Sequence, residues 1–216
     1  MRVLLIAPPG AGKGTQGAII ADHFGVPHIA TGDLLRDHVA RRTPLGRTVA
    51  EHLDRGELVP DEVVLDMLRI AFAEVARTGG GYVLDGLPRT MKQAHDAYRI
   101  GRELGVTSDV ALHLKVDDAE VTRRLLARAA LEGRSDDTAE VIAARLALYH
   151  EVTSPIIDWY AERGILITVD SSRPVPQVGR EILTALEVMS SVVDVVPEAD
   201  RRSIDLSPLS LNGQHT

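Results

Sequence analysis

The most informative stretch of the chain is Ala7-Pro8-Pro9-Gly10-Ala11-Gly12-Lys13-Gly14-Thr15. It lies between a short apolar run at residues 2–7 and a helical pattern at about 13–23, so it forms a glycine-rich turn from a strand into a helix. Successive backbone N–H groups and the helix N-terminus form a cradle for an anion there, and Lys13 adds a positive charge. Pro8 and Pro9 have no N–H, so the donors must come from Gly10 to Thr15. The pattern predicts a loop that binds the phosphates of a nucleotide.

This loop departs from the strict G-x-x-x-x-G-K-[ST] pattern at two positions. Ala7 stands where the first glycine is expected, and Gly14 stands where Ser or Thr is expected, with Thr15 one residue later. An alanine at the first position costs on the order of 1 kcal/mol if its φ must be positive, and little otherwise. The Thr15 hydroxyl is placed to lie near the Mg²⁺ that accompanies a nucleoside triphosphate.

Short apolar segments alternate with helical patterns along the rest of the chain. Buried strands are predicted at residues 2–7, 26–29, 81–85, 110–116 and 165–169. Helices are predicted roughly at residues 32–41, 46–55, 61–77, 90–104, 118–130, 137–162 and 174–189. Strands that alternate with helices pair in parallel, with helices on both faces of the sheet. The sequence therefore predicts an α/β protein with a doubly wound parallel sheet.

The composition limits the partners and the compartment. The chain has 216 residues, of which 44% are hydrophobic and 25% charged, as is typical of one globular domain. It has no cysteine, which excludes disulfides and thiolate metal sites and favours a reducing, cytoplasmic environment. The net charge of −7 argues against nucleic acid as a partner, because polyanion binding needs an excess of basic residues. No apolar stretch approaches the roughly 20 residues that span a bilayer, so no membrane association is expected.

The composition changes after Met189. Residues 190–216 have no helical stripe and carry Pro197 and Pro208 among many small polar residues. We interpret them as a disordered tail. The apolar residues 192–196 offer an alternative for this part of the tail, namely a patch that docks on another surface.

Three further segments place charged residues at the ends of predicted elements. They are Thr31-Gly32-Asp33-Leu34-Leu35-Arg36, Leu58-Val59-Pro60-Asp61-Glu62 and Asp85-Gly86-Leu87-Pro88-Arg89-Thr90, with Gln93 shortly after the third. Thr31 is the expected N-cap of a helix that carries Arg36 one turn further on. The third segment ends the strand at 81–85. Arg36 and Arg89 therefore indicate a second anion site.

In order and spacing, these motifs resemble those of the adenylate kinases. The Gly-Lys-Gly-Thr form of the loop belongs to that family's pattern, which accounts for Gly14. Later in the chain, Arg124, Arg128, the segment Gly133-Arg134-Ser135-Asp136-Asp137 and Arg145 look like the family's lid and its flanking arginines. The likeness covers roughly residues 1–187, and Ala127 departs from it by replacing a small glycine near the lid hinge.

The resemblance implies a fold and a reaction. The fold is a three-layer P-loop domain over residues 1–189, with a small helical lobe for the nucleoside monophosphate at about 31–60 and a short lid at about 128–137. The reaction is reversible phosphoryl transfer from MgATP to AMP, giving two ADP and serving adenine nucleotide homeostasis. The implied protein is a cytoplasmic monomer whose partners are ATP and AMP. It uses Mg²⁺ and no zinc, since five residues between Arg128 and Arg134 leave no room for a metal-binding knuckle.

The resemblance also assigns roles to the matched positions. Catalytic roles fall on Lys13, Asp85, Arg89, Arg124, Arg128, Arg134 and Arg145. ATP contacts fall on Gly10, Ala11, Gly12, Lys13, Gly14, Thr15, Arg124 and Arg173, the last through its backbone beside the adenine. AMP contacts fall on Thr31, Arg36, Glu57, Leu58, Val59, Gly86, Arg89, Gln93, Arg134 and Arg145. No protein group binds the metal directly: Mg²⁺ is held by the ATP phosphates, with Thr15 nearby and Asp85 holding its waters.

The chemistry of phosphoryl transfer fits these residue types. Charge spreads over the phosphoryl oxygens in the transition state, so catalysis is positioning plus stabilisation by cations. The planar fork of arginine binds phosphate in a bidentate manner, which lysine cannot do. The acceptor is already a phosphate dianion, so no general base is needed, and we interpret the histidines, including His28 and His150, as structural.

Some roles stay open on the sequence alone. Asp136 and Asp137 either cap a helix or orient the lid arginines, and Asp33 is expected to support the start of its helix rather than to bind a ligand. A CMP/UMP kinase or another nucleotide kinase on the same scaffold is the nearest alternative, although Thr31 and the spacing from Thr90 to Gln93 favour adenine. A weakly active nucleotide-binding regulator is the other, although it would not need a second phosphate site.

Overall fold

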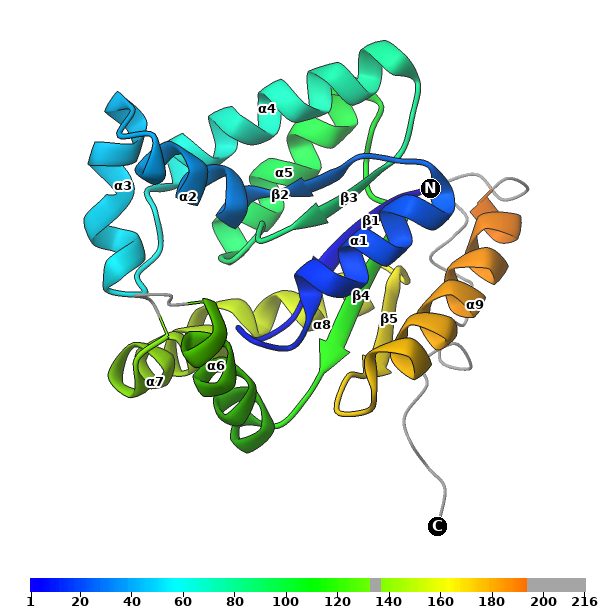
Figure 1. Ribbon diagram of the computed structural model, residues 1–216. Coiled ribbons are helices and arrows are strands. Elements are labelled where there is room, and N and C mark those ends of the chain that lie inside the picture. Colours follow the sequence, from blue (N-terminus) through cyan, green and yellow to red (C-terminus); the bar gives the residue numbers. More distant parts are fainter. Residues whose placement is uncertain (133–136, 194–216) are drawn as a thin grey trace.

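One five-stranded sheet forms the centre of the molecule. The computed structural model describes residues 1–132 and 137–193 of the chain. All strands are parallel, in the order β2-β3-β1-β4-β5 (Figure 1). Their bounds are β1 Arg2–Ile6, β2 His28–Ala30, β3 Tyr82–Asp85, β4 Val110–Lys115 and β5 Leu166–Asp170. The chain starts at the central strand β1, goes to the edge strand β2, returns to β3 beside β1, and then continues through β4 to the other edge at β5. Strands on both sides of β1 confirm the predicted doubly wound sheet.

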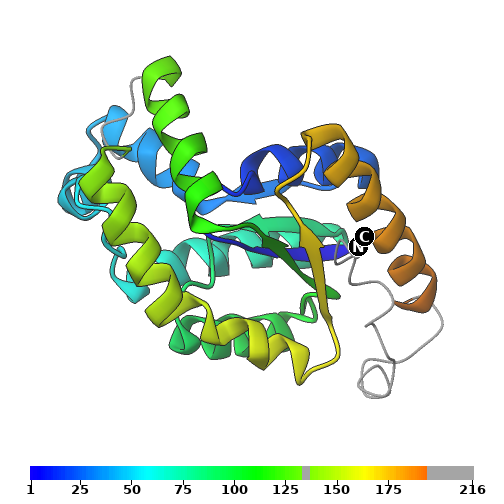
Figure 2. The ribbon, with the colours of Figure 1, turned by 90° about the horizontal axis from the view of Figure 1, so that it is seen from below.

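Helices cover both faces of this sheet (Figure 2). Successive side chains of a strand point to opposite faces. Leu4 and Ile6 of β1 belong to the core shared with α4 (Asp61–Thr78), α5 (Met91–Leu104) and α8 (Pro155–Ala161). The residues between them, Val3 and Leu5, belong to the core shared with α1 (Lys13–Phe24) and α9 (Val175–Val193). The result is the three-layer arrangement that the sequence predicts.

Two groups of helices extend beyond the sheet. The first comprises α2 (Thr31–Ala40) and α3 (Pro44–Asp54), which follow β2. The second comprises α6 (Asp118–Glu132) and α7 (Ala139–Leu148), which have a small core of their own, and the π-helical turn η1 (Tyr149–Thr153), which leads into α8. Figure 1 shows the two groups on one side of the molecule, beyond the carboxyl ends of the strands. Parallel sheets bind ligands at this edge.

The structure corrects three element boundaries. Strand β2 begins at His28 rather than at residue 26, because the Val26 N–H closes the end of α1 on the Ala21 carbonyl and Pro27 has no N–H. The helix predicted over 137–162 is divided by η1: Pro155 also lacks an N–H, and the preceding Ser154 N–H bonds to the Tyr149 carbonyl five residues back. Helix α9 ends at Val193, so the first residues of the expected tail are helical.

The remaining residues of that tail, including most of the suggested patch at 192–196, lie outside the described residues, as do residues 133–136 of the lid predicted at about 128–137. The first residues of that predicted lid belong to the end of α6. Over residues 1–132 and 137–193, no helix has the length and the apolar character needed to cross a membrane.

Candidate functional site

The loop between β1 and α1 has the backbone of an anion cradle. Gly10 and Gly12 have φ values of 79° and 94°, in the left-handed region that favours glycine. A Cβ at Gly10 would also lie 2.7 Å from the Leu125 side chain of α6, so this position needs glycine for packing as well. Gly10, Gly12, Gly14 and Thr15 line a large cavity, whereas Ala11 points its methyl group into the core beside α1.

Ala7 fits the start of the loop without strain. Its φ is not positive, and its side chain is buried in the same core as Val3 and Leu5. The cost that the sequence suggests for alanine at this position therefore does not arise. The Ala7 carbonyl has a role of its own, because it accepts a hydrogen bond from Lys13 Nζ at 2.8 Å.

Lys13 is held inside the loop that it closes. Its Nζ donates to the carbonyls of Ala7 and Pro8, at 2.8 and 3.1 Å. Burial lowers the pKa of Lys13 to about 8; Asp85 opposes this shift, and the charges of Arg89, Arg145 and Arg128 add to it. A lysine surrounded by other half-buried cations is costly unless an anion joins them. The arrangement therefore favours a highly charged ligand.

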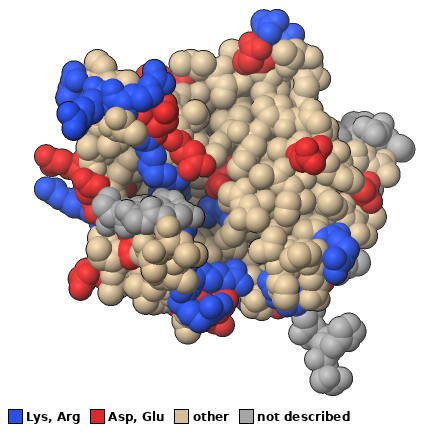
Figure 3. All heavy atoms as spheres, in the orientation of Figure 1, with Lys and Arg blue, Asp and Glu red and all other residues tan. Residues whose placement is uncertain are grey.

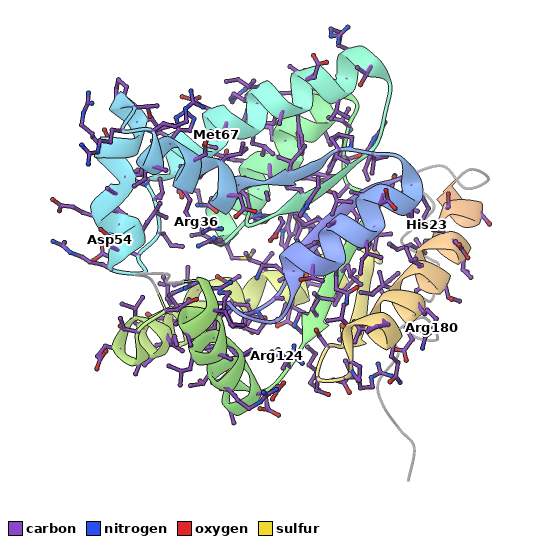
Figure 4. The ribbon with its side chains drawn as sticks, viewed as in Figure 1. His23, Arg36, Asp54, Met67, Arg124 and Arg180 are labelled. Carbon is purple, nitrogen blue, oxygen red and sulfur yellow. The ribbon has the colours of Figure 1, made fainter. Side chains whose placement is uncertain are left out.

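The loop forms one wall of a cavity of about 500 Å³. Five arginines from four segments line this cavity: Arg36 on α2, Arg89 after β3, Arg124 and Arg128 on α6, and Arg145 on α7. Asp85 lines it from the end of β3. Figure 3 shows basic atoms gathered in a hollow between the side of α2 and α3 and the side of α6 and α7, and Figure 4 places Arg36 and Arg124 on these opposite sides.

Asp137 connects two of the arginines. Its carboxylate is fully buried and accepts two hydrogen bonds from Arg128, at 2.7 and 2.8 Å, and one from Arg145 at 3.1 Å. The N-cap of α7 is Thr138, whose hydroxyl accepts from the Val141 N–H. Of the two roles left open for Asp137, orientation of arginines is therefore the one found. Arg134 and Asp136 lie outside the described residues.

Arg89 is fixed in the turn between β3 and α5. Its Nε donates to the Gly86 carbonyl at 2.9 Å, and its N–H donates to Gln93 Oε1 at 2.7 Å. Gln93 Nε2 in turn donates to Asp61 Oδ1 at 2.6 Å. Burial, followed by the charge of Arg145, lowers the pKa of Arg89, and Asp85 opposes the shift. Asp61, which the sequence indicates only as a helix start, thus supports the site through Gln93.

A second cavity of about 50 Å³ adjoins the first. The predicted AMP-site residues among the described part of the chain all line it: Thr31, Arg36, Glu57, Leu58, Val59, Gly86, Arg89, Gln93 and Arg145. Its apolar wall also includes Leu35, Leu53 and Val64, which sequence reasoning missed. The signal that could have found them is the apolar face that the helices of this lobe must turn toward a ligand or a core.

Thr31 anchors this second cavity, although not as the predicted N-cap. Ala30 occupies the cap position, and Thr31 is the first helical residue. Its buried hydroxyl donates to the Asp85 carbonyl at 3.0 Å, which joins the start of α2 to the end of β3. Asp33 lies in the first turn of α2 and pairs with the guanidinium of Arg36.

The loop after β5 contacts both the phosphate loop and α6. Arg124 donates to the Ser172 carbonyl at 3.1 Å, and its Nε donates to Glu120 at 2.7 Å. The Arg173 side chain lines neither cavity, because it pairs with Glu181. The buried hydroxyl of Ser171 donates to the Ala11 carbonyl at 2.7 Å. Sequence reasoning missed Ser171, because no pattern near it in the chain indicates a hydrogen-bond partner 160 residues away.

The histidines near the site do not form a catalytic pair. Nε2 of His28 lies 3.9 Å from the Asp85 carboxylate, and His150 contacts Asp118 on the surface. His113 on β4 lies 3.3 Å from the Tyr149 hydroxyl; burial, together with Lys115 and Lys13, lowers the pKa of this histidine to about 4. In residues 1–132 and 137–193, no three His, Asp or Glu side chains are grouped to hold a metal ion.

The phosphate loop lies at the end of the central strand, and a second anion site faces it across one arginine-lined cavity. This arrangement defines a P-loop protein that holds two phosphorylated ligands together. The comparisons with known proteins agree. The family model described as adenylate kinase matches residues 5–165. The chain belongs to the adenylate kinase family, which confirms the resemblance seen in its motifs.

The similar curated proteins are named adenylate kinase and come from several bacteria. The protein of Thermobifida fusca is 44% identical over 187 residues, which cover 87% of this chain and 98% of the relative. The protein of Kocuria rhizophila is 45% identical over 186 residues, covering 86% of this chain and 98% of the relative. The protein of Thermus thermophilus is 42% identical over 186 residues, covering 86% of this chain and 97% of the relative.

Proposed function

We propose that the protein catalyses reversible phosphoryl transfer from MgATP to AMP, giving two ADP. The observation that carries this proposal is the single cavity that joins the phosphate loop to the second anion site. A nucleotide bound on the loop would meet there a second nucleotide held by Arg36 and Arg89. A protein that only sensed one nucleotide would not need this second set of cations.

The proposed mechanism relies on positioned charges. The N–H groups from Gly10 to Thr15 bind the ATP phosphates, and Lys13 leaves the loop carbonyls to pair with them. Arg36 and Arg89 bind the AMP phosphate, whose oxygen attacks the terminal phosphorus of ATP. The bond from that phosphorus to the bridging oxygen breaks, and ADP leaves with the bridging oxygen. Arg128 and Arg145, held in register by Asp137, stabilise the charge on the transferred group. The attacking phosphate is already ionised, so no residue has to remove a proton.

Other predicted positions complete the proposed ATP site. Arg124 lies on α6 beside the loop after β5, which places it next to Ser172 and Arg173. We assign the ATP adenine to this loop, through the backbone at Arg173 rather than its paired side chain. The predicted contacts of Arg134 with the phosphates of both substrates stay a prediction.

The described residues fit a magnesium ion carried by ATP. The Thr15 hydroxyl and the Asp85 carboxylate line the same cavity and supply oxygen, the ligand atom that Mg²⁺ prefers. Thr15 would lie beside the ion, and Asp85 would hold its waters. When bound, the ion neutralises charge on the phosphates.

The two helical groups at the cavity would exclude water from the reaction. We assign residues of about 31–60 to the AMP lobe and residues of about 128–137 to a short lid, within a domain of about 1–189. Closure of the two groups over the substrates would keep the phosphoryl group from reacting with water. A monomeric state and a cytoplasmic location stay predictions from the sequence.

The choice of acceptor tests the proposed function. A coupled assay of ADP formation, with AMP, CMP, UMP and GMP compared at fixed MgATP, should give the highest kcat/KM with AMP and no turnover without Mg²⁺. The reason is that Thr31, Gln93 and the apolar wall are assigned to adenine. If CMP or UMP exceeds AMP, the pyrimidine kinase alternative is the better interpretation. Binding of nucleotides without turnover would favour the regulator.

The pKa of Lys13 gives a pH dependence to ATP capture. Phosphate favours the charged amine, so its pKa in the complex must lie above the value of about 8 in the free protein. The value of kcat/KM for ATP should therefore be constant below about pH 8 and fall above it by up to about tenfold per pH unit. Steady-state kinetics from about pH 6.5 to 9.5 measure this profile. The exposed Lys92 provides a control, since Lys92→Ala should leave the profile unchanged; a flat profile of the parent protein would contradict the role of Lys13.

A further inference from the structure

Thr153, at the end of the π-helical turn η1, makes a hydrogen bond that neither the motifs nor the proposed mechanism accounts for. Its side chain is buried, with 8% of the residue exposed, and it lines the large cavity. Its hydroxyl donates to the backbone carbonyl of Arg89 at 2.8 Å, across 64 residues of sequence. The bond joins the helical segment after α7 to the turn that carries a predicted catalytic arginine.

Two threonines in the middle of other helices behave differently. Thr122 on α6 and Thr184 on α9 donate to carbonyls four residues back in their own helices, at 2.7 and 3.0 Å. This local bond is the usual choice of a helical threonine, because its partner is always within reach. Thr153 instead bonds to a carbonyl of another segment. Its hydroxyl is therefore part of the tertiary structure at the site.

Within the described residues, the Thr153 bond is one of three that hold Arg89. The N–H of Arg89 donates to Gln93 at 2.7 Å, its Nε donates to Gly86 at 2.9 Å, and its carbonyl accepts from Thr153. These bonds fix the backbone on both sides of the Cα atom, as well as the side chain. A cation that stabilises a transition state must be in place before the reaction, and small displacements are costly.

We propose that Thr153 is a positioning residue for Arg89. Without the hydroxyl, the Arg89 carbonyl would lose this partner, and the turn would relax toward another one. The guanidinium would then move away from the AMP phosphate and the transferred group. This inference rests on the proposed function, because it concerns the same reaction.

The first experiment compares Thr153→Val, which keeps the shape but removes the hydroxyl, with Thr153→Ser, which keeps the hydroxyl. In the coupled ADP assay, Thr153→Val should lower kcat about tenfold and raise KM for AMP, with KM for ATP within about twofold. Thr153→Ser should retain kcat within about threefold. Thr184→Val is the matched control, since it loses only a hydrogen bond within its own helix. Full activity of Thr153→Val, or equal losses in the Val and Ser variants, would overturn the proposal.

A double-mutant cycle separates positioning from general damage. If Thr153 acts through the side chain of Arg89, Thr153→Val should change kcat by less than about twofold when Arg89 is already alanine. The same loss in both backgrounds would show that Thr153 acts elsewhere. Unfolded protein from both Thr153→Val and Thr153→Ala would make it a folding residue and would equally overturn the proposal.

A failure of the proposed function would not show whether Thr153 positions Arg89, so the two are tested separately. Turnover of the unsubstituted protein with MgATP and AMP is measured in the same assay, and its absence would count against the function alone. Calorimetric titration with AMP then tests Thr153 directly. Thr153→Val should weaken AMP binding at least about fivefold, and Thr153→Ser should not; unchanged affinity in the Val variant would overturn the inference.

Discussion

Replacement of Arg89 by alanine should lower kcat by roughly 10²–10⁴-fold, because one well-placed cation at a transition state is worth several kcal/mol. The site makes Arg89 hard to replace. Its half-buried guanidinium lies close enough to Asp85 and Arg145 for both charges to act on its pKa. The neighbouring arginines have partners of their own, since Arg145 pairs with Asp137 and Arg36 with Asp33. Water in the space left by the side chain would screen charge but could not supply a cation.

The measurement for Arg89 combines kinetics with a test of folding. Steady-state kinetics with ATP and AMP varied, together with a urea unfolding curve, compare Arg89→Ala with the parent protein. Arg41→Ala is a matched control, because Arg41 is exposed and its side chain pairs, within the described part of the chain, with Asp37 of the adjoining helix α2. Arg89→Lys keeps the charge without the fork and should recover only part of the rate. Near-parental kcat in Arg89→Ala would remove this residue from the catalytic set.

Replacement of Arg128 by alanine should also lower kcat by roughly 10²–10⁴-fold, for the same electrostatic reason. A second consequence follows from Asp137. Its fully buried carboxylate would lose two of the hydrogen bonds that it accepts from arginine, while that from Arg145 remains. Loss of one partner of a buried ion pair destabilises the fold. The melting temperature should therefore fall by roughly 2–8 °C, a loss reduced by the remaining pair.

The two effects of Arg128→Ala can be separated. Kinetics at a temperature well below the transition report catalysis, and thermal unfolding reports stability. Asp137→Asn is the informative comparison, because it keeps Arg128 but weakens its orientation, so its loss of kcat should be smaller. If Asp137→Asn is as inactive as Arg128→Ala, orientation rather than charge is the contribution of Arg128. A full rate in Arg128→Ala would exclude the residue from catalysis.

Much of the fold and of the site follows from local sequence patterns. The five strands and the loop from Gly10 to Thr15 depend on apolar periodicity and on glycine at positive φ, both of which can be read from neighbouring residues. The arginines of α6 and α7 that line the cavity were predicted through the resemblance to adenylate kinases. The start of β2 and the π-helical turn were missed because the Val26 and Ser154 N–H groups bond to carbonyls outside the regular pattern of a strand or an α-helix.

The parts of the site that could not be predicted depend on contacts between distant segments. The Asp137 bonds to Arg128 and Arg145 were one of two options on the sequence, and the fold decided between them. The bonds from Ser171 to Ala11 and from Thr153 to Arg89 span 160 and 64 residues. Ser and Thr are common on surfaces and in helices, so neither residue signals such a bond until the backbone brings its partner close.

The segment from Arg145 to Thr153 also limits how the chain can change in evolution or design. Arg145 lies in the last turn of α7, and Thr153 ends η1, so one nearly continuous helical rod presents both residues to the same cavity. Each residue of a helix turns the chain by about 100°, so a single insertion or deletion between them would rotate one of the two away from the substrates. We expect point substitutions on the outer face of this helical segment to be tolerated, whereas a change in the number of its residues should not be.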